Sequence, residues 1–199
     1  MSAIVELSAG FTDKVLGAQS SFRSVMEALA RPASMQRVTT GTGAVPGLMP
    51  AAAAIALTLF DHDTPIWLDP QLAATGVAEW LKFHTGAPVT AATAESSFAL
   101  VTDGASLPPL ERFALGSSEY PDRSTTVILQ VENLGEGPAY ELHGPGIDGT
   151  AMLNAVISPG DLFERLAFNA KLFPRGIDVV LVHDDAIVAI PRTTRLVGG

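Results

Sequence analysis

The sequence lacks cysteine, and lysine occurs only three times among its 199 residues, as Lys14, Lys82 and Lys171. The absence of cysteine excludes disulfides, thiolate nucleophiles and cysteine-ligated zinc, and it suits the reducing cytoplasm, where we expect this protein. None of the lysines follows the apolar strand that is typical of a Schiff-base lysine. Pyridoxal phosphate chemistry is therefore disfavoured, and we expect no cofactor.

Basic side chains are also few, and the formal net charge is -9. Binding to a phosphate backbone needs a basic face, so nucleic acid is disfavoured as the main partner. The charge is unevenly spread, because residues 38–164 carry a net charge of -12 and both ends of the chain are net positive. A site for a small anion must therefore draw heavily on the two ends.

Long apolar runs are missing as well. The run from Ala51 to Phe60 has ten residues, too few to cross a membrane, and Pro46 and Pro50 precede it, which favours a buried helix. The first residues lack a basic stretch followed by an apolar one, so we expect no signal peptide. Hydrophobic residues nevertheless make up 47% of the chain, enough for a sizeable core.

Helical spacing of apolar residues predicts several helices. One covers residues 22–29, begins at Ser20 or Ser21 as the cap and ends before Pro32. A second begins at Pro50 and runs through Leu59. Others cover residues 77–84, ended by a glycine at 86, and the stretch from 161 to 170.

Apolar and β-branched runs predict strands at residues 64–68, 97–103, 125–131, 176–183 and 186–190. In the third of these, Val127 and Leu129 point to one face and Ile128 to the other, as in a strand buried between two layers. A further strand over residues 139–144 is expected to pair with it as a hairpin. Together these elements predict an α/β fold, with helices packed on a mixed sheet, in one domain over residues 1–199.

Two glycine-rich loops invite a dinucleotide-binding interpretation. The first holds Gly41, Gly43 and Gly47, and the second holds glycines at 144, 146 and 149. The strand ahead of the first loop is short and polar, and Asp148 would place a carboxylate against a phosphate in the second. Tight turns therefore explain both loops better than a nucleotide site does.

Histidines offer one candidate for chemistry. No histidine pair has the spacing of a metal site, so no metal is expected. His62 lies between Asp61 and Asp63, whose carboxylates would orient its ring and favour its charged form. The alternative is that His62 is a turn residue at a helix end.

Four arginines stand at strand boundaries: Arg123, Arg175, Arg192 and Arg195. Guanidinium groups stay charged and donate bidentately, which suits phosphate and phosphonate oxygens. Next to the first of them, Tyr120 and Asp122 complete a charged turn. The alternative is that these arginines form ion pairs with Asp122, Asp178 or Glu132 and hold loops in place.

Seven segments in series resemble a known family. They read RPASMQRV, LTLFDHDTPIWLD, WLKFHTGAP, GSSEYPDRSTTVILQVE, LHGPGI, FNAKLFPRGIDVVL and AIPRTTR. This series is similar to the PhnH family of the phosphonate carbon–phosphorus lyase system, and it covers most of the chain, from Phe22 to Arg195. EYPDRS, LFPRGID and PRTT together are far more specific than any one of them. Ala33 stands where the family has glycine in its RPG pattern.

The resemblance implies a role in bacterial phosphonate utilisation and a fold similar to pyridoxal-phosphate-dependent transferases, without that cofactor. It also implies a homodimer that joins PhnG, PhnI and PhnJ in a core complex. With PhnG, PhnI and PhnL, the family takes part in forming α-D-ribose 1-methylphosphonate 5-triphosphate from ATP and methylphosphonate, with release of adenine. The resemblance assigns cleavage of the carbon–phosphorus bond to PhnJ, and to PhnH no activity on its own.

Two hypotheses follow for the role of this chain. In the first, it is an accessory subunit for dimerisation and docking that does not contact substrate. In the second, it forms part of a substrate site, where the four arginines bind phosphoryl oxygens of ATP or a phosphonate. Proton transfer would then fall to His62, or to Tyr120 with Asp122.

Overall fold

The computed structural model describes residues 10–39, 41–158 and 160–197. The helices are α1 (Lys14–Ala30), α2 (Pro50–Leu59), α3 (Pro70–Ala73), α4 (Val77–Thr85) and α5 (Leu162–Ala170). The strands are β1 (Gln36–Arg37), β2 (Ile66–Leu68), β3 (Phe98–Val101), β4 (Thr126–Gln130), β5 (Asn133–His143), β6 (Ala151–Val156), β7 (Asp178–His183), β8 (Ala186–Ile190) and β9 (Arg195–Leu196). None of the described helices is both long enough and apolar enough to cross a membrane.

The strands form two sheets. The larger has six strands in the order β1-β8-β7-β4-β3-β2, of which β2, β3, β4 and β7 run parallel. β8 is antiparallel to both of its neighbours, so the predicted α/β fold with a mixed sheet is confirmed. The smaller sheet is antiparallel, with β5 between β6 and β9.

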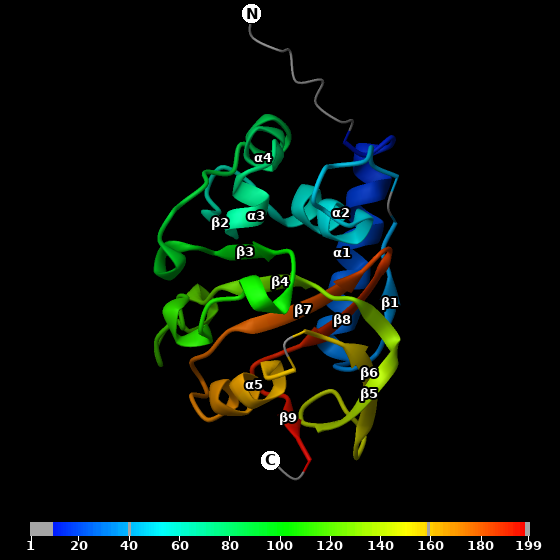
Figure 1. The fold of residues 1–199 in the computed structure, drawn as a ribbon, viewed down its shortest axis with the longest axis vertical. Coiled ribbons are helices and arrows are strands. Elements are labelled where there is room, and N and C mark those ends of the chain that lie inside the picture. Colours follow the sequence, from blue (N-terminus) through cyan, green and yellow to red (C-terminus); the bar gives the residue numbers. More distant parts are fainter. Residues whose placement is uncertain (1–9, 40, 159, 198–199) are drawn as a thin grey trace, which may run out of the picture.

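In Figure 1 the larger sheet lies between helices α1, α2 and α4 on one side and α5 with the smaller sheet on the other. An apolar core fills each side. Ile128 faces the core that α1, α2 and α4 close, whereas Val127 and Leu129 face the core that α5 and the smaller sheet close. All three side chains are fully buried, as predicted for a strand between two layers. Burial on both faces explains why the middle of β4, from Val127 to Leu129, is a continuous apolar run.

Local signals set most helix ends. α2 begins at Pro50 and α4 ends at Gly86, whose φ of 75° is left-handed, both as predicted. α1 ends before Pro32 as predicted, but the prediction that it begins at Ser20 or Ser21 was wrong. It begins one residue after Asp13, whose carboxylate accepts hydrogen bonds from the backbone nitrogens of residues 15 and 16 and so caps the helix.

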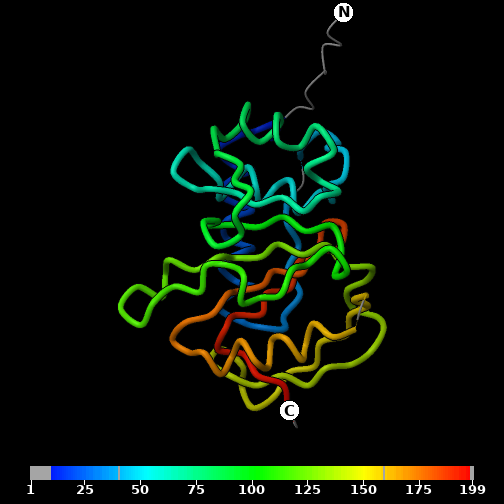
Figure 2. Tube along the Cα trace, turned by 60° about the vertical axis from the view of Figure 1, so that its left-hand side comes forward, coloured from blue at the N-terminus to red at the C-terminus, as the bar shows by residue number. Residues whose placement is uncertain are grey.

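The predicted hairpin between residues 125–131 and 139–144 was also wrong. Residues 139–144 belong to the longer strand β5, which pairs with β6 and β9 in the smaller sheet. β4 has no free edge for them, because β3 and β7 already occupy both of its sides. The last strand, β9, lies beside β5 and close to α5, so it belongs to the smaller sheet (Figure 2).

Candidate functional site

Three of the four arginines are placed at one edge of the larger sheet. Arg123 precedes β4, Arg175 precedes β7 and Arg192 follows β8. Because β4 and β7 are parallel neighbours and β8 runs antiparallel to β7, these three positions share an edge. Open α/β sheets usually bind ligands at the carboxyl ends of their parallel strands. These three arginines lie at the opposite edge, where the parallel strands begin.

Arg192 holds two loops against the sheet. Its guanidinium donates to both carboxylate oxygens of Asp178, at 3.2 and 2.5 Å. It also donates to the Pro121 carbonyl oxygen at 2.7 Å and to Ser124 Oγ at 2.6 Å. Four of its five guanidinium hydrogens are therefore in use, and the ion pair that the sequence offered as the alternative is present.

The turn ahead of β4 presents Arg123 to solvent. Residues 121–123 form one short 3-10 helix, and the central carbon of the Arg123 guanidinium lies 4.2 Å from the centroid of the Tyr120 ring. This cation–π contact orients the guanidinium without neutralising its charge. Asp122 forms no ion pair with Arg123 in the described part of the chain, and it lines a pocket of about 360 Å³ together with Phe173.

Arg175 lies in the loop between α5 and β7 and is exposed. Behind it, the buried side chain of Asn169 donates to the carbonyl oxygen of Ile177 and accepts from its backbone nitrogen, each at 2.9 Å. Gly176 has a φ of 129°, and a Cβ there would stand 2.9 Å from Asn169 Oδ1. The start of β7 is therefore held by hydrogen bonds, whereas the arginine beside it is exposed.

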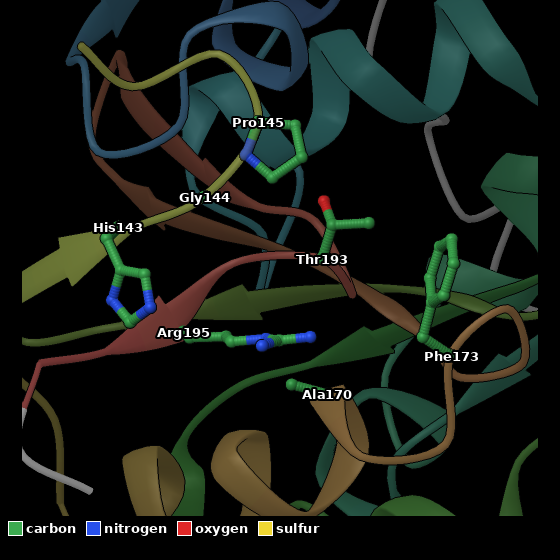
Figure 3. A pocket seen from close by; sticks show the side chains of 7 residues that line it. All are labelled: His143, Gly144, Pro145, Ala170, Phe173, Thr193 and Arg195. Atoms are coloured by element: carbon green, nitrogen blue, oxygen red, sulfur yellow. The ribbon is translucent and has the colours of Figure 1, made fainter. Parts of the chain in front are cut away.

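Arg195 lies in a groove formed by β5, β9 and α5, which adjoins the pocket of Asp122 because Phe173 and Thr193 line both. Two adjoining pockets of about 270 and 480 Å³ make up this groove, which we call the basic groove. Its lining residues are His143, Gly144, Pro145, Ala167, Ala170, Lys171, Phe173, Thr193, Arg195 and Leu196. In Figure 3 the Arg195 side chain runs across the pocket between Thr193 and Ala170, with His143 at one end and Phe173 at the other.

His143 and Arg195 are directly opposite each other in the antiparallel register of β5 and β9. Side chains at opposed positions lie on the same face of a sheet, so both reach the groove. His143 Nδ1 is enclosed and has no hydrogen-bond partner among the described residues. Sequence reasoning did not select His143, Lys171 or Phe173, because the strand pairing that gathers them joins segments about fifty residues apart.

The glycine-rich loops are explained by packing. A Cβ at Gly146 would stand 2.2 Å from the Ala30 carbonyl oxygen, and one at Gly144 would stand 2.9 Å from the Thr193 carbonyl oxygen. Ahead of α2, the backbone nitrogens of Met49 and Ala51 donate to Gln130 Oε1 and to the Asp184 carbonyl oxygen. The donors that a dinucleotide phosphate would need at this helix start are thus already used.

His62 is exposed in the turn between α2 and β2, at the far end of the sheet from β8. Its Nε2 lies 3.3 Å from Asp63 Oδ2, as the sequence suggested for a neighbouring carboxylate. It lines neither the basic groove nor the pocket that holds Asp122. The structure therefore does not bring His62 together with Tyr120 and Asp122.

Asp103 follows β3 and therefore lies at the carboxyl edge of the larger sheet. Burial raises the pKa of its carboxyl, but hydrogen bonds from the backbone and side chain of Ser106 and from Gln71 lower it, and the pKa lies below its ordinary value. The Ser106 backbone nitrogen is 2.7 Å from Asp103 Oδ1 and Gln71 Nε2 is 3.1 Å from Oδ2. The Ser106 bond closes the turn after β3, and the Gln71 bond ties this turn to α3.

Comparison with known proteins identifies the class to which this fold and site belong. The family model described as a bacterial phosphonate metabolism protein matches residues 9–197. The chain therefore belongs to the PhnH family, as the motif series predicted.

Two curated relatives are similar in sequence. The α-D-ribose 1-methylphosphonate 5-triphosphate synthase subunit PhnH of Rhizobium meliloti (strain 1021) is 44% identical over 189 residues, which are 95% of this chain and 94% of that protein. The putative C-P lyase subunit protein HtxG of Stutzerimonas stutzeri is 41% identical over 83 residues, which are 41% of this chain and 42% of that protein.

Proposed function

We propose that this protein is a subunit of the synthase that forms α-D-ribose 1-methylphosphonate 5-triphosphate in phosphonate catabolism. The observation that carries the proposal is the 44% identity to a subunit of that synthase over 95% of this chain. In the reaction, a phosphonate oxygen forms a bond to the ribose C1′ of ATP, and adenine leaves. The exposed arginines suit such a role, because guanidinium groups bind phosphoryl oxygens bidentately.

The partner subunits in this proposal are PhnG, PhnI and PhnJ, and the protein acts with them in the cytoplasm rather than alone. Support comes from the names of the two relatives, each of which is called a subunit. A fold similar to pyridoxal-phosphate-dependent transferases belongs to the same proposal. All three lysines are exposed on α1, α4 or the end of α5, which supports a function without pyridoxal phosphate.

A homodimer through α1 is part of the proposal. Val15, Leu16, Phe22 and Met26, which we call the α1 stripe, are apolar and about half exposed or more. Val15, Phe22 and Met26 follow the spacing i, i+7 and i+11, so they share one helix face. Several exposed apolar residues on one helix are typical of a helix that packs against another chain. The same face favours the alternative role, in which the chain serves assembly and does not contact substrate.

Reconstitution tests the proposed function. ATP and methylphosphonate are incubated with the other synthase subunits, with and without this chain. Adenine release is followed by chromatography, and the triphosphate product is followed by ³¹P NMR. We expect product only when this chain is present. Equal product formation in its absence would refute the proposal. Serum albumin, an unrelated protein, is added in place of this chain as a control for a general protein effect.

A further inference from the structure

The basic groove has an unusual charge for this molecule. The chain holds 21 acidic and 12 basic residues, yet no aspartate or glutamate lines either of the two pockets that form the groove. Lys171 and Arg195 both line it, and neither has an ion-pair partner among the residues that the structure describes. Two unneutralised cations in a concave site attract an anion, because the surrounding protein focuses their field.

Hydrogen-bonding groups surround these cations. Thr193 and His143 line the same pocket as Arg195, and the His143 Nδ1 atom has no partner. An enclosed nitrogen without a hydrogen bond is rare in folded proteins, and it costs about 1–3 kcal/mol. A small rotation of the ring would let a ligand oxygen in the groove satisfy it. The groove thus offers two charged side chains and two further hydrogen-bonding side chains to one anionic group.

An aromatic ring lies at the end of the groove. Phe173 is 60% exposed, lines the pocket opposite His143 and has no ring partner among the described residues (Figure 3). A large exposed ring beside a cationic site is typical of nucleotide recognition, in which the ring stacks on a base and the cations bind the phosphates. Stacking on an aromatic ring does not distinguish one base from another, so contacts to the phosphates orient most of the ligand.

From these observations we propose that the basic groove binds the polyphosphate chain of a nucleoside or ribosyl triphosphate. Arg195 binds the chain bidentately, Lys171 adds a second charge, and Thr193 and His143 donate hydrogen bonds. Lys171 follows the last residue of α5, where the helix dipole is negative, so part of its charge is offset and Arg195 dominates. This assignment rests on the proposed function, because it names the part of the synthase substrate that this subunit holds.

Calorimetry on the full chain tests the assignment. Sodium tripolyphosphate, ATP and adenosine are titrated without magnesium, at low and at physiological salt. We expect tripolyphosphate and ATP to bind and adenosine not to bind. Arg195→Gln should weaken both interactions at least tenfold, and Lys171→Gln should weaken them less. Equal affinities for the two polyphosphates support recognition of the chain alone, whereas tighter ATP binding that Phe173→Ala removes supports a contact with the base as well.

A matched variant separates the groove from general charge. Arg112 is an exposed arginine that lines neither pocket of the groove and forms no ion pair among the described residues, so Arg112→Gln changes the net charge equally. Equal losses in Arg112→Gln and Arg195→Gln, or no binding of tripolyphosphate by the wild type, would overturn the assignment. Reconstitution with the other synthase subunits separates the two proposals. If the wild type and Arg195→Gln support product formation equally in that assay, the groove proposal fails and the proposed subunit role stands. If neither supports it, the subunit role fails as well.

Discussion

Arg192 and Asp178 are joined by two guanidinium hydrogen bonds, and the backbone nitrogen of Arg192 makes a third to the same carboxylate at 2.8 Å. The two side chains are 14% and 20% exposed. The pair thus links the end of β8 to the start of β7 and, through Ser124 and the Pro121 carbonyl oxygen, to the turn before β4. Arg192 lies at the same edge as the exposed Arg123 and Arg175, but its main role is to anchor these segments to one another.

We expect Arg192→Ala to lower the free energy of unfolding by about 3 kcal/mol, because it leaves Asp178 largely buried without its partner. Urea unfolding followed by circular dichroism measures the change. Arg175→Ala removes the same charge from an exposed side chain at the same sheet edge and is expected to change stability by about 0.5 kcal/mol or less. Equal losses in the two variants would show that Arg192 is not an anchor.

Gly146→Ala should be more destabilising than Gly149→Ala. Both glycines have a left-handed φ, 84° and 71°, so alanine costs about 1 kcal/mol at either position from backbone strain. Only at Gly146 would the new Cβ also meet the Ala30 carbonyl oxygen, at 2.2 Å, whereas nothing lies within 4 Å at Gly149. We expect a total loss of about 3 kcal/mol for Gly146→Ala in urea unfolding. A smaller loss than for Gly149→Ala would contradict the packing explanation of this loop.

Acid stability should depend on Asp103. Its pKa is lower in the folded protein than in the unfolded chain, so ionised Asp103 stabilises the fold above the unfolded pKa. That stabilisation is lost as the pH falls below about 4 and through the folded pKa. We expect Asp103→Asn to be less stable than the wild type at pH 7, with the difference shrinking towards pH 3.

Urea midpoints at pH 7, 5 and 3 measure the effect of Asp103. Glu119→Gln is the control, because Glu119 is an exposed carboxylate with no hydrogen-bond partner among the described residues. A constant difference between Asp103→Asn and the wild type across the three pH values would rule out the linkage.

The α1 stripe should control self-association. We expect the double substitution of Phe22 and Met26 by lysine to halve the mass measured by light scattering, because it places two charges in an apolar interface. Phe168→Lys, at a similarly exposed ring on α5 and on the other side of the sheet, should leave the mass unchanged. A double variant with the mass of the wild type would place the interface elsewhere.

Elements set by local signals were predictable from the sequence. Pro50 begins α2, Gly86 ends α4, and the continuous apolar run around Ile128 indicates a strand buried on both faces. The start of α1 was not, because Asp13 is as good a cap as the serines that follow it, and only the packing of the helix shows which one acts. The two-residue strand β9 carries too few residues for any periodicity.

The candidate site also has features that the sequence predicts and features that only the structure shows. The sequence by itself determined the family, the α/β class and the position of each arginine at a strand boundary, because these depend on residue order and local pattern. Only the tertiary structure decided that Arg192 is tied to Asp178, that His62 lies apart, and that His143 and Arg195 share a groove. These relationships arise from strand direction and pairing between distant segments, and such long-range geometry leaves no periodic trace in a single sequence.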